Sequence, residues 1–262
     1  MQSFRPTQLS ALGRIHTGNE AVTAIGEARA AGFDNLNIDL MHGLPQQTPE
    51  QAMEDIDQAL ALDPEHLSWY QLTLEPNTAF FHPPPLPEEE ALWDIQEAGH
   101  QRLEQAGLKR YEISAYARPG LQSHHNLNYW RFGDYLGIGA GAHGKLTQID
   151  SQGAWQIERR WKTRQPDAYL RRANDPRGFV AGQQLIEPLD LPLEFAMNAL
   201  RLTEGVPLAD WAAHTGQPEA LLLARLHSAQ EKGLLVEMPE KLRASPQGLL
   251  FLNELLALIS EE

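Results

Sequence analysis

Two adjacent histidines and two large aromatic residues lie close together in the string HHNLNYW. They are His124, His125, Tyr129 and Trp130, with Asn126 among them. Imidazole is a common axial ligand of heme iron, and aromatic rings suit a flat apolar ligand, so the string is compatible with heme binding. A second interpretation stays open, because aromatics at this density also pack cores and a histidine is more often a hydrogen-bonding group. On an extended strand the two histidines would point to opposite faces, so one of them would reach iron.

A single carboxylate stands out in the first part of the chain. Asp39 lies near the end of the alternating segment NLNIDLM, which is followed by His42, Gly43 and Pro45. In a β/α barrel, ligand sites collect at the carboxyl ends of the strands, which favours a functional role for Asp39. The alternative is that Asp39 caps the turn that follows.

Three glycines after the aromatic string have the spacing of a dinucleotide-binding fingerprint. Gly139, Gly141 and Gly144 are followed by Glu158. The fingerprint requires a helix to begin within the glycines, whereas 145–161 has the pattern of strand and turn, so we reject this interpretation. The glycines are better explained by close approach of the backbone to another backbone or to a ligand. The sequence also lacks a Gly-x-Ser-x-Gly elbow and metalloprotease histidine spacing.

Composition excludes several classes of site. The 262 residues include no cysteine, which rules out disulfides, thiolate zinc sites and cysteine-held iron–sulfur clusters for this chain. The formal net charge of −14 opposes nucleic-acid binding, which depends on Lys and Arg at the phosphates. No apolar run approaches the ~20 residues that a spanning helix needs, and the first residues lack a secretory signal. We therefore expect a cytoplasmic protein with no integral membrane segment.

The first part of the chain alternates strand-like and helix-like segments, which predicts an α/β fold with parallel strands. Three such units cannot close an eight-stranded barrel, so residues 1–145 are predicted to be an incomplete β/α barrel with an open sheet edge. Thr48, Pro49 and Gln51 have the pattern of a helix start with a capping box. The expected elements are helix 10–32, strand 35–41, helix 48–62, strand 66–74, helix 88–106 and strand 110–116.

The last part has a different order, which resembles a smaller winged-helix-like α+β domain. We place this domain at 182–262 and a connecting segment at 146–181. Residues 182–262 hold 12 Asp and Glu against 5 Lys and Arg, a net charge of −7, so packing or partner docking is favoured over DNA binding. The expected elements are helices 193–203, 208–214 and 219–232, strand 234–238 and helix 247–259.

Several strings together resemble the HemW-type heme chaperones of the radical-SAM superfamily, and the resemblance spans essentially the whole chain. HNLNYW with its following glycine segment is specific to this group. The strings are QSF (2–4), LGRIH (12–16), NIDLMHGLP (37–45), YEISAYARPG (111–120), HNLNYW (125–130), GDYLGIGAGAH (133–143) and NALRLTEGVP (198–207).

The resemblance implies the following cofactors. Members of this family carry an N-terminal Cys-x-x-x-Cys-x-x-Cys segment, not found in this sequence, that holds a [4Fe-4S] cluster with S-adenosylmethionine. By the same resemblance, Gln2, Arg14 and Asp39 fall where S-adenosylmethionine is contacted, with Asp39 accepting from the ribose hydroxyls. The HNLNYW string is the implied heme site, with His125 as the axial ligand and Asn126, Tyr129 and Trp130 beside it. Many relatives have cysteine near Ser123.

The implied function is a heme-binding chaperone that transfers heme to an acceptor protein. The alternative is a radical-SAM enzyme resembling the oxygen-independent coproporphyrinogen III oxidases, a class to which the family is related. Without the cluster cysteines we expect this chain alone to have no such activity. A truncated, nonfunctional chain is a third possibility. The acceptor, the choice between His124 and His125, and a homodimeric state are left open.

Overall fold

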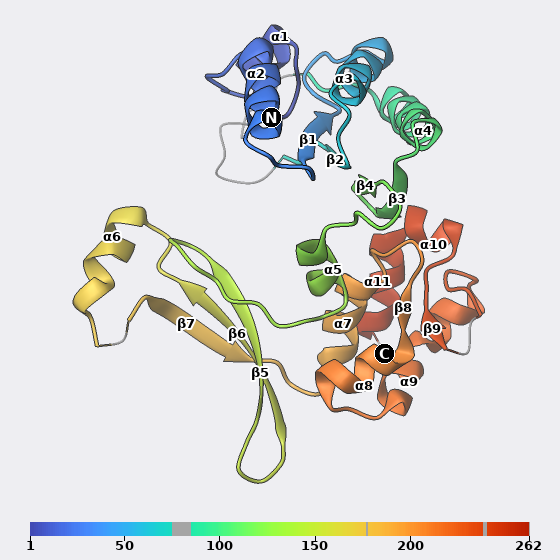
Figure 1. Cartoon of the computed structure of the whole chain (residues 1–262). Coiled ribbons are helices and arrows are strands. Elements are labelled where there is room, and N and C mark those ends of the chain that lie inside the picture. Colours follow the sequence, from blue (N-terminus) through green and yellow to red (C-terminus); the bar gives the residue numbers. More distant parts are fainter. Residues whose placement is uncertain (75–84, 177, 238–239, 262) are drawn as a thin grey trace. The chain divides into compact units, whose positions relative to one another are not determined.

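The computed structural model describes residues 1–74, 85–176, 178–237 and 240–261 (Figure 1). The chain forms two compact units, Met1–Ser123 and His124–Glu262. The sequence placed the end of the first domain at residue 145, whereas in the structure residues 124–145 belong to the second unit. Within the described residues, no helix is long and apolar enough to cross a membrane.

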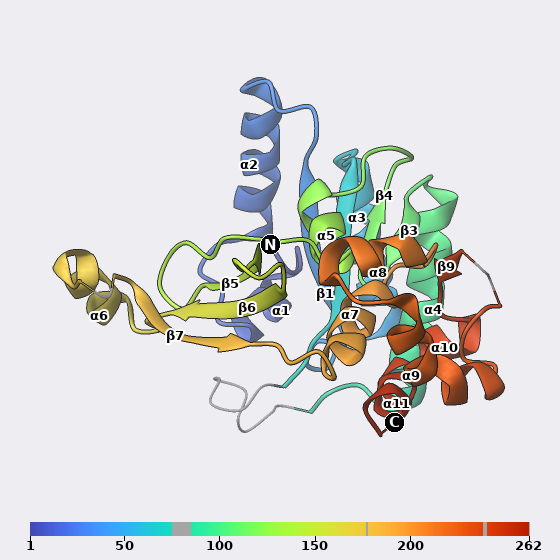
Figure 2. The same ribbon diagram turned by 90° about the horizontal axis from the view of Figure 1, so that it is seen from below.

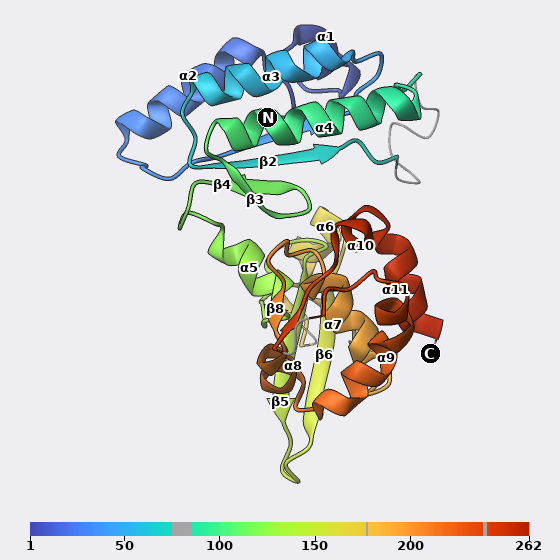
Figure 3. The ribbon, with the colours of Figure 1, turned by 90° about the vertical axis from the view of Figure 1, so that its right-hand side faces the viewer.

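The first unit is an α/β layer structure. Its four-stranded sheet has the order β1-β2-β4-β3, and α3 and α4 lie side by side along the sheet (Figure 3). The elements are α1 (Pro6–Ala11), α2 (Gly18–Ala30), β1 (Asn37–His42), α3 (Pro49–Ala61), β2 (His66–Gln71), α4 (Glu89–Gln105), β3 (Lys109–Glu112) and β4 (Ala115–Ala117).

Strands β1 and β2 carry an apolar face and a polar face. They are parallel, with Asn37 opposite His66 and Asp39 opposite Ser68. Because side chains alternate along a strand, these polar residues share one face and the intervening residues share the other. The apolar face packs into the core of the unit, and its buried members include Ile38, Leu40, Leu67 and Trp69.

Local sequence signals explain where the first helices begin. Helix α3 begins after Thr48 with the expected capping box, in which Thr48 and Gln51 each bond the other's backbone. The single helix expected over 10–32 was wrong, because the chain turns at Gly13, where φ is +65°, and α2 starts afresh. Thr17 and Glu20 form a second capping box at that start.

The third predicted strand, 110–116, is a hairpin instead. Strands β3 and β4 are antiparallel, and β4 pairs antiparallel with β2, so only β1 and β2 have the expected parallel arrangement. The side chain of Glu112 accepts a hydrogen bond from the Ser114 amide at 3.0 Å and closes the turn. A period-two pattern is the same before and after such a turn, which is why the sequence reads as one strand.

The second unit combines an antiparallel sheet with a helical part. The sheet has the order β5-β6-β7 and ends at α6, away from the helices (Figures 1 and 2). The elements are α5 (His124–Trp130), β5 (His143–Ile149), β6 (Trp155–Lys162), α6 (Pro166–Arg171), the 3-10 turn η1 (Arg172–Asn174), β7 (Val180–Leu185), α7 (Leu191–Ala199), β8 (Val206–Pro207), α8 (Leu208–Thr215), α9 (Glu219–Glu231), β9 (Lys241–Leu242), α10 (Pro246–Leu250) and α11 (Leu252–Glu261).

The helical part follows the predicted order of helices, but it also contains the unpredicted two-stranded sheet of β8 and β9. Two further differences concern its C-terminal elements. In place of strand 234–238, Leu235 forms an isolated bridge with Ala244, while residue 238 lies outside the described residues. The helix expected over 247–259 is broken at Phe251, where φ is −108° and ψ is 43°. The helices meet around buried aromatic rings: Phe195 lies 5.4 Å from Trp211 and 5.7 Å from Phe132 between ring centroids.

Substitution of Gly99 in α4 tests how tightly the first unit is packed. A Cβ at Gly99 would lie 1.8 Å from the Trp69 ring, so we expect Gly99→Ala to lower the free energy of unfolding by about 1–3 kcal/mol through overpacking. Gly26 in α2 has open space around its Cα, so Gly26→Ala should instead stabilise by up to about 1 kcal/mol. Urea unfolding of both variants measures the difference. Equal effects would show that Trp69 does not constrain α4.

Candidate functional site

The histidine-aromatic string forms a helix, α5, and not the strand that the sequence suggested. Successive side chains on a helix are about 100° apart, and residues four apart share a face. His125 therefore lies on the same face as Tyr129, and Asn126 lies with Trp130. Both His124 and His125 are exposed, so the choice between them depends on what surrounds each ring.

His125 begins a row of three rings. Its ring centroid lies 4.8 Å from that of Tyr129, and Tyr129 stacks on Tyr135 at 4.1 Å with an interplanar angle of 29°. Burial, and to a smaller degree the neighbouring Tyr135, raises the pKa of Tyr129, so its phenol stays neutral. The row places an exposed imidazole at the edge of an aromatic surface, whereas no ring contact of His124 is found in the described part of the chain.

The segment after Tyr135 adds exposed apolar side chains. Leu136 is 74% exposed and Ile138 is 86% exposed. The segment is held by a pair of 3.0 Å backbone hydrogen bonds between Tyr135 and Lys145. A Cβ at Gly137 would lie 2.3 Å from a backbone oxygen of His143, so glycine permits this approach. Exposed large apolar residues beside a row of aromatic rings are typical of a surface that binds a flat apolar molecule.

Trp130 makes an edge contact with Tyr129, with ring centroids 6.4 Å apart, and it also has a neighbour outside the row. Its ring lies 4.3 Å from the guanidinium carbon of Arg201, a cation–π contact, and the side chain is half-buried. The indole nitrogen of Trp130 is buried and has no hydrogen-bond partner among the described residues. Trp130 and Asn126 thus lie on a second face of α5, and their expected contact with heme stays a prediction.

The chain after α5 is fixed to the helical part by charged groups. Arg131 donates two hydrogen bonds to Asp210 of α8, at 2.7 and 3.0 Å. The ammonium of Lys145 donates to Asp134 at 2.8 Å and lies 4.3 Å from the ring centroid of buried Phe132. These contacts position Tyr135 beside Tyr129.

Burial and the ion pair between Asp134 and Lys145 act in opposite directions on the pKa values of these two groups. Burial would raise the pKa of Asp134, but hydrogen bonds from Lys145 and Thr147 lower it below its ordinary value. Burial lowers the pKa of Lys145 against the opposing pull of Asp134. The ionised carboxylate is therefore favoured in the folded state.

The lowered pKa predicts an acid-dependent loss of stability. A carboxylate with a lower pKa in the folded state stabilises fully above its unfolded pKa of about 4, and this contribution disappears as the pH falls through the folded pKa. Urea unfolding between pH 3 and 7 should show a smaller decrease at low pH for Asp134→Asn than for the unchanged chain. Parallel curves for the two proteins would contradict this assignment.

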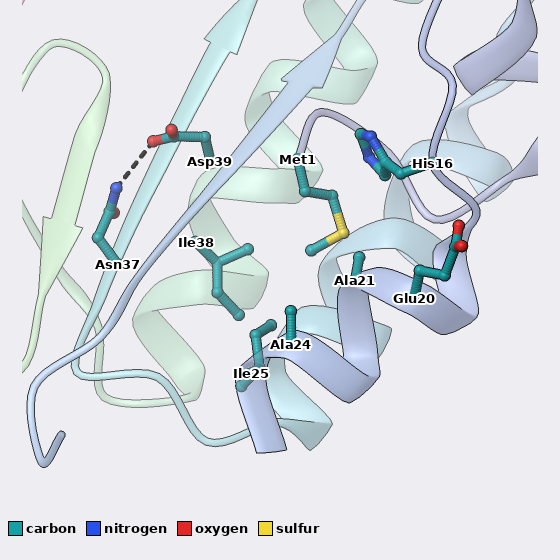
Figure 4. Close-up of a pocket in the computed structure, with 9 residues that line it drawn as sticks. All are labelled: Met1, His16, Glu20, Ala21, Ala24, Ile25, Asn37, Ile38 and Asp39. Carbon is teal, nitrogen blue, oxygen red and sulfur yellow. Dashed lines mark hydrogen bonds between the residues drawn. The ribbon is translucent and has the colours of Figure 1, made fainter. Parts of the chain in front are cut away.

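The first unit holds the other expected site. Asp39 lies on the polar face of β1, where the side-chain amide of Asn37 donates to it at 2.8 Å. A cavity of about 500 Å³ lies beside β1 (Figure 4). Asn37 and Asp39 lie on one side of the strand, and Ile38 and α2 lie on the other. Its remaining lining residues are Met1, His16, Glu20, Ala21, Ala24 and Ile25.

The three residues expected at S-adenosylmethionine all influence the pKa of one phenol, that of Tyr70. The backbone oxygen of Gln2 accepts from the Met41 amide at 2.8 Å, which places Gln2 beside β1. Burial and the charge of Asp39 raise the pKa of Tyr70, while Gln2 and the charge of Arg14 oppose that rise. Gln2 thus lies beside the strand that carries Asp39, while Arg14 is related to the two only through its charge effect on Tyr70. Tyr70 was not singled out from the sequence.

Comparison with known proteins agrees with this architecture. Residues 186–251 match the family described as the HemN C-terminal domain. The whole chain is 48% identical to the heme chaperone HemW of Escherichia coli, covering 67% of it, and 46% identical to HemW of Haemophilus influenzae, covering 66% of it. The chain thus spans about two thirds of the length of these relatives.

A solved structure has the same fold. Coproporphyrinogen III oxidase (HemN) from Escherichia coli, a radical SAM enzyme, matches 99% of this chain with a TM-score of 0.76 and 18% identity, over 62% of its own length. The 48% identity to the Escherichia coli chaperone over the whole of this chain shows that the chain belongs to the HemW family.

Proposed function

We propose that the second unit binds heme, with the His125 imidazole as the axial ligand of the iron. The observation that carries the proposal is the row His125, Tyr129 and Tyr135, which ends in an exposed imidazole. One imidazole suffices to hold such a metal, because the porphyrin itself supplies four nitrogen ligands. The relatives named as heme chaperones support the same assignment.

The residues around the row have distinct roles in this proposal. Tyr129 and Tyr135 offer stacked rings to the porphyrin edge. Contact between the porphyrin and the exposed side chains of Leu136 and Ile138 removes apolar surface of both from water. The exposure of His125 suits a carrier, because a ligand held at the surface can reach an acceptor without opening a core. We infer a cytoplasmic heme chaperone that passes heme to an acceptor protein.

Titration of the chain with hemin, followed by visible absorption, tests this function. We expect a Soret shift that saturates at one heme per chain. Leu136→Ser with Ile138→Ser should weaken binding by roughly tenfold, because about 1.5 kcal/mol of apolar contact would be lost. A linear, unsaturated absorbance change in the cooperatively folded chain would exclude a specific heme site.

We also propose that the polar face of the first unit binds the nucleoside part of S-adenosylmethionine. The supporting observations are that Asp39 lines the cavity along β1 and that the backbone oxygen of Gln2 bonds Met41 of the same strand. Asp39 would accept hydrogen bonds from ribose hydroxyls. Chemical-shift titration with adenosine tests the nucleoside site.

A further inference from the structure

A continuous row of hydrogen bonds crosses the polar face of the first sheet and ends at Asp39. The side-chain amide of Asn37 lies 2.8 Å from Asp39 Oδ1, and Asn37 Oδ1 lies 2.6 Å from Nδ1 of His66. On the other side of the imidazole, Nε2 of His66 lies 2.7 Å from the Tyr111 hydroxyl. The row joins three strands, β1, β2 and β3, and His66 is only 4% exposed.

The charge of Asp39 fixes the direction of every donor in this row. An ionised carboxylate only accepts, so Asn37 must turn its NH2 group to Asp39 and its oxygen to His66. An amide oxygen also only accepts, so Nδ1 of His66 must carry the proton. Burial lowers the pKa of His66, although the charge of Asp39 opposes this, and the ring is neutral near pH 7. Nε2 is then an acceptor, and the Tyr111 hydroxyl donates to it.

The amide of Asn37 has no alternative orientation. Its oxygen also accepts from the Ser68 hydroxyl at 3.1 Å, so both lone pairs are used. A flipped amide would direct its NH2 group at His66 and its oxygen at the carboxylate, which would lose the bond to Asp39. Asp39 Oδ1 is thereby held in place, and no donor to Oδ2 is found among the described residues.

We propose that Tyr111, His66 and Asn37 form a positioning relay that orients the Asp39 carboxylate for the vicinal hydroxyls of a ribose. This inference rests on the nucleoside site proposed above and assigns new roles to residues that do not touch the ligand. One oxygen of Asp39 is fixed by Asn37, and the other is presented to the ligand. His66 and Tyr111 are positioning residues, since they act through Asn37.

The tautomer of His66 tests the relay without any ligand. Long-range nitrogen–proton correlation spectra of the 15N-histidine-labelled chain at pH 7 should show His66 protonated at Nδ1. Asn37→Leu removes the acceptor and should shift the spectrum away from that pure tautomer. A neutral ring protonated at Nε2 in the unchanged chain would reverse the relay and overturn the inference, whatever the chain binds.

Ribose discrimination supplies the second readout. Chemical-shift titrations with adenosine and 2′,3′-dideoxyadenosine should show about tenfold preference for adenosine in the unchanged chain. His66→Phe should reduce this preference by about fivefold while leaving dideoxyadenosine binding unchanged. His66→Asn retains a donor at the position of Nδ1 and should restore the preference. His100→Asn alters a half-buried histidine bonded to Tyr116 and serves as the matched control.

The outcomes separate the two proposals. If the unchanged chain does not discriminate between the two nucleosides, the nucleoside site fails and the relay's role with it, while the tautomer result still reports on the hydrogen bonds. If the unchanged chain discriminates and folded His66→Phe does so equally well, the site stands and the relay is overturned. Equal loss in His66→Phe and His100→Asn would also overturn it, because the effect would then be general destabilisation.

Discussion

His125→Ala is expected to abolish the saturable Soret shift that hemin produces with this chain. In the proposed site His125 supplies the iron ligand, and even partners that only support a metal ligand typically contribute 10–100-fold in affinity, so loss of the ligand should cost at least about 100-fold. The measurement is an absorption titration with hemin, at protein concentrations where the unchanged chain saturates. The exposure of His125 means that the substitution should leave folding intact.

His124→Ala is the matched control for this result. The two histidines are adjacent and both exposed, but only His125 has a ring contact with Tyr129 in the described residues. We expect His124→Ala to bind hemin within about twofold of the unchanged chain, a difference below 0.5 kcal/mol. If His124→Ala abolished hemin binding and His125→Ala did not, His124 would be the iron ligand. The row of His125, Tyr129 and Tyr135 would then have no part in the site.

Asp134→Asn should produce the largest loss of stability among the surface substitutions considered. It leaves the ammonium of Lys145, whose side chain is 3% exposed, without its ion-pair partner. An unpaired buried charge costs several kcal/mol, and because Asp134 itself is 40% exposed we expect the lower end, about 3 kcal/mol in the free energy of unfolding. Asparagine keeps an acceptor for Thr147, so urea unfolding reports mainly the loss of charge.

The double variant Asp134→Asn with Lys145→Met separates the charge from the packing. A methionine can fill the space over Phe132 without a charge, so the double variant should recover most of the lost stability. If the double variant is as unstable as Asp134→Asn alone, the loss comes from contacts of Asp134 other than the ion pair.

The sequence predicts the fold best where local chemistry is decisive. The start of α3 follows from Thr48, Pro49 and Gln51, because the capping box needs only those residues. The hairpin of β3 and β4 could not be predicted, since it depends on pairing of β4 with β2 rather than on the alternation within 110–116. The break between α1 and α2 had a local signal, Thr17 and Glu20, that the continuous alanine pattern obscured.

The sequence indicates the residue types of the proposed heme site but not their arrangement. The residue types of HNLNYW indicate a heme ligand with aromatic neighbours, yet the strand assumed for them was wrong. The stacking of Tyr135 on Tyr129 depends on how the chain turns back after α5, a tertiary feature without a periodic pattern. Arg201, which packs on Trp130, lies 71 positions further along the chain, so the two faces of α5 could not be distinguished from the sequence.

The most direct test of the central claim is pulsed electron paramagnetic resonance of the ferric heme complex formed with 15N-histidine-labelled chain. The account predicts coupling of the iron to one imidazole nitrogen of the protein, which disappears in His125→Ala and persists in His124→Ala. Absence of histidine coupling in the unchanged chain, or coupling that survives in His125→Ala, would contradict the assignment of His125 as the heme ligand.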